Sequence, residues 1–295
     1  MNAGILLLVA ITTGCSPAST QDIHQPFRVF SQNAGTTPYL DLIGASPVRS
    51  TCETYYENNL CTTDAEDALF EAIDEERPSV VLLQELWYQP WCEAAGRPEE
   101  SNAPPFVCSR SGPQLERILP SGYAVARSIL YPDNAIAFDE TVISGEDELV
   151  SLEASCGPPG RIAFLNAAFR DAPLFIAVIH AQAGLGSDAQ ACRIDQFAAL
   201  EEVLAALPEE TPLIIGGDVN HDVTASSPDA MRWRAMADAV GLQRLEDNGD
   251  TARLLVMDLD IVATRGVLGG AQCQIHQLDE GWSEPMFDHA SLNCE

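Results

Sequence analysis

Short runs of apolar residues and longer stretches with helical spacing follow one another along this chain. Residues 80–83, 174–179 and 213–215 are unbroken apolar runs, a pattern typical of strands that are buried on both faces. The stretch 27–32 mixes apolar and polar positions and is broken by Asn33-Ala34-Gly35, which predicts a strand that runs into a loop. We therefore expect a sheet whose strands alternate with other elements.

Helical spacing occupies the intervals between these runs. Apolar residues four apart at Ala65, Leu69 and Ile73 predict a helix over 65–76. A second set of apolar residues shares one helical face over 192–207 and predicts an amphipathic helix. The remaining elements are expected as helices at 114–119 and 228–240, strands at 259–263, 271–277 and from 290 onward, and several short strands within 123–170.

The alternation of strands and helices continues without an internal repeat or a linker-like stretch. This pattern predicts one α/β domain, which we place at 26–295. In sheets of this kind, ligands gather where the carboxyl ends of the strands meet. The polar residues that follow the apolar runs are therefore the first candidates for a functional site.

The first residues have the pattern of an export signal. An apolar run over 5–11 is too short to cross a bilayer, and it leads into Thr12-Thr13-Gly14-Cys15. Small residues before a cysteine resemble a bacterial lipoprotein cleavage box, although Thr12 replaces the usual leucine and no Lys or Arg precedes the run. We expect 1–15 to be a signal peptide that ends at a lipidated Cys15, and 16–25 to be a tether. The protein would be anchored to a bacterial envelope membrane or secreted.

Cysteine usage supports an oxidising compartment. With Cys15 set aside, eight of the nine cysteines remain, and an even set in an exported protein predicts disulfides. No C-x-x-C spacing occurs, which disfavours a zinc site. Many pairings are possible, and we expect the one that joins neighbours in the sequence: Cys52–Cys61, Cys92–Cys108, Cys156–Cys192 and Cys273–Cys294.

The charge of the chain is strongly negative. The net charge is −29, and all 15 basic residues are arginines. This balance opposes loose binding to polyanions, because affinity for phosphate comes mainly from Lys and Arg. It does not exclude a nucleic-acid substrate, since bound metal ions and a few arginines can hold a phosphate in an acidic protein. The plainer interpretation is that the charge keeps an exported protein soluble.

Polar residues stand at the ends of the predicted strands and near the C-terminus: Asn33, Gln84-Glu85, His180, Asp218-Val219-Asn220, Asp258, Asp260 and Asp288-His289. Burying a carboxylate is costly unless it is paired or bound to a metal. Because the chain has few arginines, several such carboxylates suggest a shared cation. Oxygen ligands of this kind suit Mg²⁺ or Mn²⁺ better than zinc.

Each of these residues also has a plainer interpretation. Asn33 alone is compatible with a turn, and His180 alone is more often a hydrogen-bonded buried histidine. Asp218-Val219-Asn220 alone is compatible with a helix cap. The set as a whole, in its order and spacing, favours a functional site over these separate interpretations.

That order resembles the endonuclease/exonuclease/phosphatase superfamily, which includes deoxyribonuclease-I-like nucleases, abasic-site endonucleases, bacterial sphingomyelinases and inositol-phosphate phosphatases. The resemblance covers 27–294. Its most specific motif is Gly217-Asp218-Val219-Asn220, which matches the family's G-D-x-N, and Arg193-Ile194-Asp195-Gln196 resembles its R-x-x-Q. The fold that this resemblance implies is a four-layer α/β sandwich, with two packed mixed β-sheets flanked by helices.

The resemblance also implies roles around a metal. Glu85 would ligate the metal, with Asn33 beside it, and Asp288 would help to bind it. Asp218 would activate or orient the attacking water, or share a second ion. Asn220 would hold a phosphoryl oxygen. Such a site would use Mg²⁺, with Mn²⁺ as the alternative.

The two histidines would act on the phosphate in the same scheme. His289 would contact it, with Asp260 fixing the tautomer of the imidazole, although Asp258 lies on the same strand face and stays an alternative. His180 would contact the phosphate or protonate the leaving oxygen. The deoxyribonuclease branch pairs this histidine with a glutamate on a middle strand, and the sequence does not identify that glutamate.

Two loops that follow site strands carry aromatic residues. The loop 36–62 contains Tyr39, Tyr55 and Tyr56, and the loop 87–113 contains Trp87, Tyr88, Trp91 and Phe106. Exposed aromatics could stack on bases or enter a lipid interface, but they could equally form small cores around the disulfides. Arginines clustered at the pocket would favour a polyanionic substrate, and the candidates are Arg28, Arg49, Arg97, Arg110 and Arg127.

These observations predict an exported, monomeric, metal-dependent phosphoesterase that hydrolyses a phosphodiester by attack of water. A phosphomonoesterase acting on lipid head groups or sugar phosphates is one alternative. A non-catalytic surface protein that keeps the fold for binding is another. The retention of Glu85, Asp218 and His289 together favours the enzyme.

Overall fold

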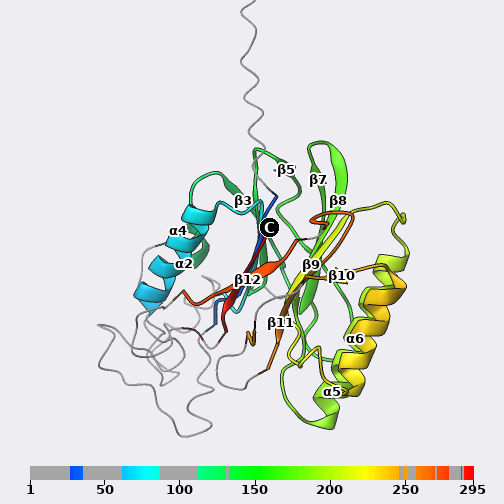
Figure 1. Cartoon of the computed structure of the whole chain (residues 1–295). Helices are drawn as coiled ribbons and strands as arrows, with labels where there is room; N and C mark the ends of the chain where they lie inside the picture. Colours follow the sequence, from blue (N-terminus) through cyan, green and yellow to red (C-terminus); the bar gives the residue numbers. More distant parts are fainter. Residues whose placement is uncertain are drawn as a thin grey trace, which may run out of the picture.

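Two β-sheets face each other at the centre of the structure, and helices cover their outer faces (Figure 1). The computed structural model describes residues 27–35, 62–86, 112–130, 133–245, 249–251, 257–269, 271–278, 287 and 289–295. Within this part of the chain the predicted α/β sandwich is confirmed.

The first sheet has six strands in the order β12-β13-β1-β2-β4-β3. Its strands are β1 (Val29–Asn33), β2 (Val80–Gln84), β3 (Tyr123–Arg127), β4 (Ala135–Asp139), β12 (Cys273–His276) and β13 (Ser291–Cys294). β1 and β2 run parallel, with Asn33 opposite Gln84, whereas the other pairs are antiparallel. The sheet is therefore mixed.

The second sheet follows the order β10-β11-β9-β8-β7-β5, and β6 also pairs with β7. Its strands are β5 (Ile143–Ser144), β6 (Val150–Ser151), β7 (Ile162–Phe169), β8 (Ala172–His180), β9 (Leu213–Asp218), β10 (Gln243–Arg244) and β11 (Asp260–Arg265). Here β8 and β9 form the parallel pair, with His180 opposite Asp218. Each sheet thus contributes one parallel pair that ends in polar residues.

Apolar side chains of the two sheets meet between them. Leu82 of the first sheet packs in one cluster with Ile176 and Ile214 of the second, and all three are fully buried. Because side chains alternate across a strand, the other apolar residues of these strands face outward. They are covered by helices rather than by solvent, which explains the unbroken apolar runs.

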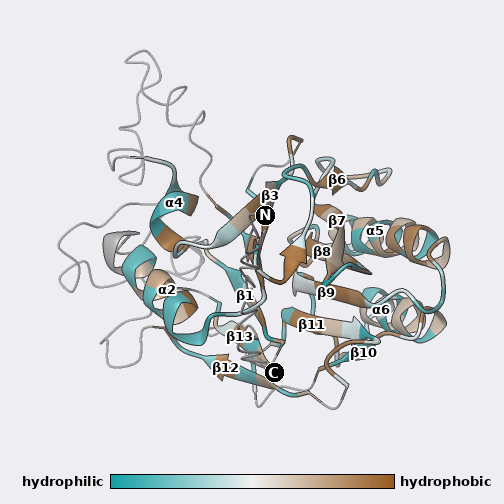
Figure 2. Ribbon diagram, turned by 90° about the horizontal axis from the view of Figure 1, so that it is seen from above, coloured by the Kyte–Doolittle hydropathy of each residue, from teal (hydrophilic) through white to brown (hydrophobic). Residues whose placement is uncertain are grey.

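The helices form the two outer layers. They are α2 (Thr62–Glu76), α4 (Gln114–Ile118), α5 (Ser187–Ala205) and α6 (Pro228–Ala239). Leu69 and Ile73 of α2 pack on the outer face of the first sheet, and Phe197 and Leu200 of α5 pack on that of the second. Figure 2 shows α5 and α6 beside each other on one side of the molecule and α2 and α4 on the other.

Several element boundaries differ from the prediction, most of all the start of α5. The amphipathic helix was expected over 192–207, but α5 begins at Ser187, because polar residues of its first turn carry no apolar spacing. The strand predicted from the apolar run 213–215, ending in Gly216-Gly217-Asp218, is confirmed, because β9 runs from Leu213 to Asp218. A Cβ on Gly216 would lie 2.7 Å from Leu82 Cδ1 of the facing sheet, so these glycines allow a close approach within the sandwich.

Two of the four expected disulfides are confirmed. Cys156 is bonded to Cys192 and Cys273 to Cys294, whereas the expected pairs Cys52–Cys61 and Cys92–Cys108 lie outside the described residues. The predicted signal segment, with Cys15, also lies outside them. None of the described helices has the length and hydrophobicity needed to cross a bilayer.

Candidate active site

The polar ends of four strands meet at one edge of the sandwich. β1 and β2 end at Asn33 and Gln84, and β8 and β9 end at His180 and Asp218. This edge lies on the side of the molecule away from the β7–β8 turn (Figure 1). Parallel strands bring their carboxyl ends to the same edge, so the fold gathers residues that are far apart in sequence.

The carboxylate of Asp218 lies at the centre of this edge, 98% buried. Its Oδ2 accepts a hydrogen bond from Nδ2 of Asn33 at 3.2 Å, and the same amide donates to Glu85 Oε1 at 3.2 Å. Oδ1 of Asn33 accepts from the backbone N–H of Gly35 at 3.0 Å. Asn33 therefore holds the two carboxylates together, and direct ligation of a metal by its Oδ1 would require the bond to Gly35 to open.

Asp260 enters the site from β11, which runs antiparallel to β9 and places Asp260 opposite Asp218. Oδ2 of Asp260 lies 2.7 Å from Nδ1 of His289, and Nε2 of His289 lies 3.9 Å from Asp218 Oδ2. Asp258 does not reach the histidine, because its carboxylate is paired with Arg244 and bonded to Thr251. Of the two aspartates, the structure places Asp260, the first residue of β11, against His289.

Asn220 is fixed by three hydrogen bonds. Its backbone N–H donates to Asp218 Oδ1 at 2.7 Å, and its Nδ2 donates to Asp218 Oδ2 and to the carbonyl of Ala181, both at 3.0 Å. Both N–H groups of the amide are thus used. To hold a phosphoryl oxygen, as predicted, Asn220 would have to release one of these bonds.

Two residues of the site, Glu85 and Asn220, have a left-handed backbone conformation. Their φ values are +57° and +53°, in a region that residues other than glycine rarely adopt. A Cβ on Gly35 would lie 1.7 Å from Glu85 Oε2, so Gly35 leaves the space that the carboxylate occupies. An unfavourable backbone conformation is therefore tolerated at Glu85 and Asn220, the residues whose side chains enter the site.

His180 lies among these groups and is buried. Its Nε2 is 3.4 Å from Glu85 Oε1 and 4.0 Å from Asp218 Oδ2. Burial lowers the pKa of His180, an effect opposed by the nearby Glu85 and reinforced by Arg161. Both carboxylates stand at strand ends, Glu85 just after β2 and Asp218 at the end of β9.

The donor set fits a divalent cation. Glu85, His180 and Asp218 bring ligand atoms within 4.8 Å of one another, and Asp218, Asp260 and His289 form a second such group. Oδ1 of Asp260 is buried without a hydrogen-bond partner. Burial also raises the pKa of Asp218, which marks the cost of gathering carboxylates without a countercharge. A cation among these oxygens would remove that cost.

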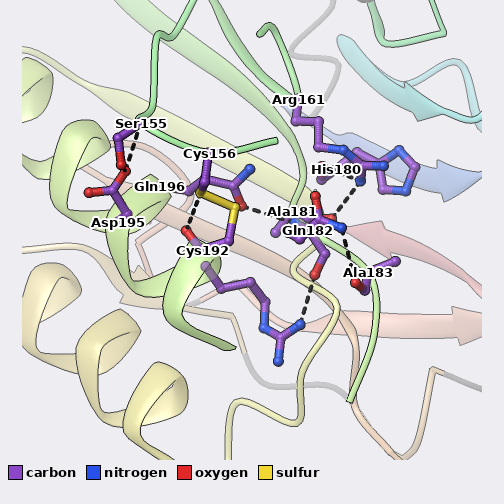
Figure 3. The surroundings of a disulfide bond; sticks show 11 residues. Ser155, Cys156, Arg161, His180, Ala181, Gln182, Ala183, Cys192, Asp195 and Gln196 are labelled. Carbon is purple, nitrogen blue, oxygen red and sulfur yellow. Dashed lines mark hydrogen bonds between the residues drawn. A yellow bond between two sulfur atoms is a disulfide. The ribbon is translucent and has the colours of Figure 1, made fainter. Parts of the chain in front are cut away.

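The residues of the R-x-x-Q motif, Arg193 and Gln196, lie on α5 and contact the segment that follows His180. Arg193 pairs with Asp229 and also donates to the carbonyls of Gln182 and Gly184, at 2.7 and 2.8 Å. Oε1 of Gln196 accepts from the backbone N–H of Gln182 at 3.0 Å. Both side chains therefore hold the segment that follows His180, as Figure 3 shows for Gln196.

Some predicted site features lie outside the described residues: Asp288, the aromatic residues Tyr39, Tyr55, Tyr56, Trp87, Tyr88, Trp91 and Phe106, and the arginines Arg49, Arg97 and Arg110. Arg28 lies at the opposite end of β1, bonded to Glu76 and Glu295, and is not part of the site. No sequence pattern singled out Arg161, which directly precedes β7 and whose guanidinium lies at the carbonyls of His180 and Ala181.

Comparison with known proteins supports the fold. No protein-family model and no curated protein matches the sequence. A humanized TDP2 from D. rerio is 12% identical with a TM-score of 0.56, covering 91% of this chain and 97% of that chain. A beta toxin from Staphylococcus aureus is 10% identical with a TM-score of 0.57, covering 91% and 99%. The endonuclease domain of TRAS1, a telomere-specific non-LTR retrotransposon, is 13% identical with a TM-score of 0.52, covering 91% and 97%.

Proposed function

We propose that this protein, whose fold is that of the endonuclease/exonuclease/phosphatase superfamily, is a metal-dependent hydrolase of phosphodiesters. The observation that carries the proposal is the convergence of Glu85, Asp218, Asp260, His180 and His289 on one edge of the sandwich. Two similar structures support it, since one is an endonuclease domain and a TDP2 from D. rerio was solved with a single-strand DNA product.

The metal would be held by Glu85 and Asp218, with Asn33 beside them and Asp288 as a predicted further ligand. A bound Mg²⁺ or Mn²⁺ supplies positive charge that stabilises the phosphoryl oxygens in the transition state. The chain itself supplies the remaining groups. Asp218 would orient the attacking water and accept its proton, because its carboxylate lies buried at the centre of the site, within 4.0 Å of Nε2 of both His180 and His289.

The histidines would bind and orient the phosphate. Because Nδ1 of His289 faces a carboxylate oxygen of Asp260, the proton of a neutral ring lies on Nδ1, and Nε2 is left for the site. A protonated His289 would donate from Nε2 to a phosphoryl oxygen. His180, kept neutral by burial, has one N–H to donate, which suits a hydrogen bond to the phosphoryl or leaving oxygen.

The test is an assay of purified protein lacking residues 1–15. Bis-p-nitrophenyl phosphate, p-nitrophenyl phosphate, plasmid DNA and sphingomyelin would be offered with Mg²⁺ or Mn²⁺ and with chelator. We expect turnover of a diester that chelator abolishes and that Asp218→Ala and His289→Ala both lose. Turnover of the monoester alone would favour a phosphomonoesterase. Folded protein that binds metal and turns over none of these substrates would favour a binding protein, and turnover surviving both substitutions would refute the site.

The location of the protein is also a proposal. Two disulfides in the described part of the chain fit an oxidising compartment, which supports export. Lipidation of Cys15 would add a membrane anchor. In bacterial cells expressing the full chain, we expect the protein to incorporate labelled palmitate and to lose the label in the Cys15→Ser variant. A wild-type chain without label would refute the anchor but not the enzyme.

A further inference from the structure

The carbonyl oxygen of Ala181 accepts hydrogen bonds both from Arg161 and from a residue of the site, Asn220. It accepts a hydrogen bond from Nη1 of Arg161 at 2.8 Å and a second from Nδ2 of Asn220 at 3.0 Å. The same Nη1 lies 3.4 Å from the carbonyl oxygen of His180. Figure 3 shows Arg161 beside His180, with Ala181 next to both. One guanidinium thus holds the last residue of β8 and the residue that follows it.

The Ala181 carbonyl holds one of the two N–H groups of the Asn220 amide. Nδ2 of Asn220 has two hydrogens, one directed to Ala181 and the other to Asp218 Oδ2. Ala181 is also tied to this aspartate through its backbone, because its N–H donates to the carbonyl of Asp218 at 2.8 Å. A shift of the Ala181 carbonyl would therefore turn the Asn220 amide and alter its bond to the Asp218 carboxylate.

The backbone of Arg161 and the loop before it are held by hydrogen bonds and by a disulfide. Its backbone carbonyl accepts from the N–H of His180 at 2.8 Å and from Nδ2 of Asn134 at 3.0 Å. The loop before it is tied to α5 by the Cys156–Cys192 disulfide and by Ser155, whose hydroxyl and N–H both donate to Asp195. The segment that carries Arg161 is therefore fixed by hydrogen bonds and a disulfide, which place the guanidinium at the end of β8.

We propose that Arg161 is a positioning residue of the active site, which holds the Ala181 carbonyl and through it fixes the Asn220 amide against Asp218. The inference rests on the proposed function, because it assigns Asn220 a part in hydrolysis. A direct contact between Arg161 and the substrate phosphate is the competing explanation. The two differ in one respect: a residue that acts through Asn220 has no effect once Asn220 is gone.

The test is a double-mutant cycle on diester hydrolysis. We expect Arg161→Gln to lower kcat about tenfold or more, with KM for bis-p-nitrophenyl phosphate changed much less. In an Asn220→Ala background the same substitution should change kcat less than about twofold. Arg161→Lys, which keeps a charged donor of similar reach for Ala181, should retain more activity than Arg161→Gln, whose side chain is shorter and neutral. Arg161→Met, which has no donor, replaces Arg161→Gln in the cycle if that variant does not fold.

The matched control is Arg265→Gln. Arg265 also donates to backbone carbonyls, those of Pro208, Thr211 and Val240, but it lies at the end of β11 away from the site. We expect this substitution to lower thermal stability and to leave kcat near the wild-type value. A loss of kcat equal to that of Arg161→Gln would overturn the proposal, since any missing guanidinium would then have the same effect.

A second readout does not depend on turnover. The two Nδ2 proton resonances of Asn220 are identified as the pair that Asn220→Ala removes from the amide spectrum. We expect both to shift in Arg161→Gln and to stay in place in Arg265→Gln. Additive losses in the kinetic cycle, or unchanged Asn220 resonances in Arg161→Gln, would overturn the proposal. If the wild-type chain hydrolyses no diester, the proposed function fails while this spectrum still decides the position of Asn220.

Discussion

Nδ1 of His289 lies 2.7 Å from Oδ2 of Asp260, and both residues are buried beside Asp218. A carboxylate in this position fixes the tautomer and the ring orientation of the histidine. Asp260→Asn should therefore lower kcat/KM for a diester about 10–100-fold, because an amide can present a donor to Nδ1 and favour the other tautomer. Steady-state kinetics with bis-p-nitrophenyl phosphate would measure the loss.

Asp258→Asn is the control for this substitution. Asp258 lies two residues before Asp260, just ahead of β11, and it pairs with Arg244 instead of with the histidine. We expect the variant to unfold at a lower temperature and to keep kcat/KM near the wild-type value. Equal losses of activity in the two variants would show that the His289–Asp260 contact has no special part in the reaction.

Glu85→Gln should weaken metal binding. The substitution keeps the shape of the side chain and removes a negative charge from the group formed with His180 and Asp218. We expect the affinity for Mn²⁺, measured by the electron paramagnetic resonance signal of the free ion, to fall about tenfold or more. Glu140→Gln removes the same charge from an exposed turn after β4 and should leave the affinity unchanged. Equal affinities in all three proteins would place the ion elsewhere.

The stability of the metal-free protein should fall as pH rises, in part because of Asp218. Burial raises the pKa of this carboxyl from 3.8 to about 7, so the folded chain keeps a proton that the unfolded chain releases between these values. The contribution to stability is fully present below about pH 4 and is lost as pH rises through about 7. Thermal unfolding in chelator, from about pH 5 to about pH 8, would measure it.

The comparison variant for this pH dependence is Asp218→Ala, in which the titrating carboxyl is gone. We expect its melting temperature to change less over the same pH range than that of the wild type. Mg²⁺ should flatten the wild-type dependence, because a cation favours the ionised carboxylate. If the two proteins lose stability in parallel, Asp218 does not titrate in this range.

Gly217→Ala should destabilise the fold strongly. A Cβ at this position would lie 2.1 Å from the carbonyl oxygen of Ile179 and 3.0 Å from Nε2 of Gln84, and φ is +125°. We expect the free energy of unfolding to fall by more than about 3 kcal/mol, measured by denaturant titration. Gly269→Ala, which has open space around it, should change it by less than about 0.5 kcal/mol. If Gly217→Ala is as stable as the wild type, the backbone at 217 does not approach Ile179 and Gln84 this closely.

Replacing Cys156 and Cys192 together by serine should also lower stability. The disulfide joins residues 36 apart in sequence, and a loop of this length corresponds to about 3–4 kcal/mol in the chain-entropy description. Denaturant titration under non-reducing conditions would measure the difference. An unshifted midpoint, with free thiols detected in the wild-type protein, would show that the bridge does not form.

Much of the architecture is determined by local patterns in the sequence. Apolar runs at 80–83, 174–179 and 213–215 mark central strands, because strands covered on both faces carry few polar residues. The polar residues at their ends are then candidate site residues, since parallel strands end at a common edge. The disulfides Cys156–Cys192 and Cys273–Cys294 were also expected from proximity in the sequence, and the structure confirms them.

The tertiary structure alone decided the contacts within the site. The spacing of Asp258 and Asp260 predicted a shared strand face, so both stayed candidates, and the choice follows from the positions of Arg244 and His289. Arg161 meets His180 because β7 and β8 pair antiparallel, a register that no local spacing reveals. Periodicity specifies which face of a strand a residue occupies, whereas the partner across that face depends on how distant segments pack together.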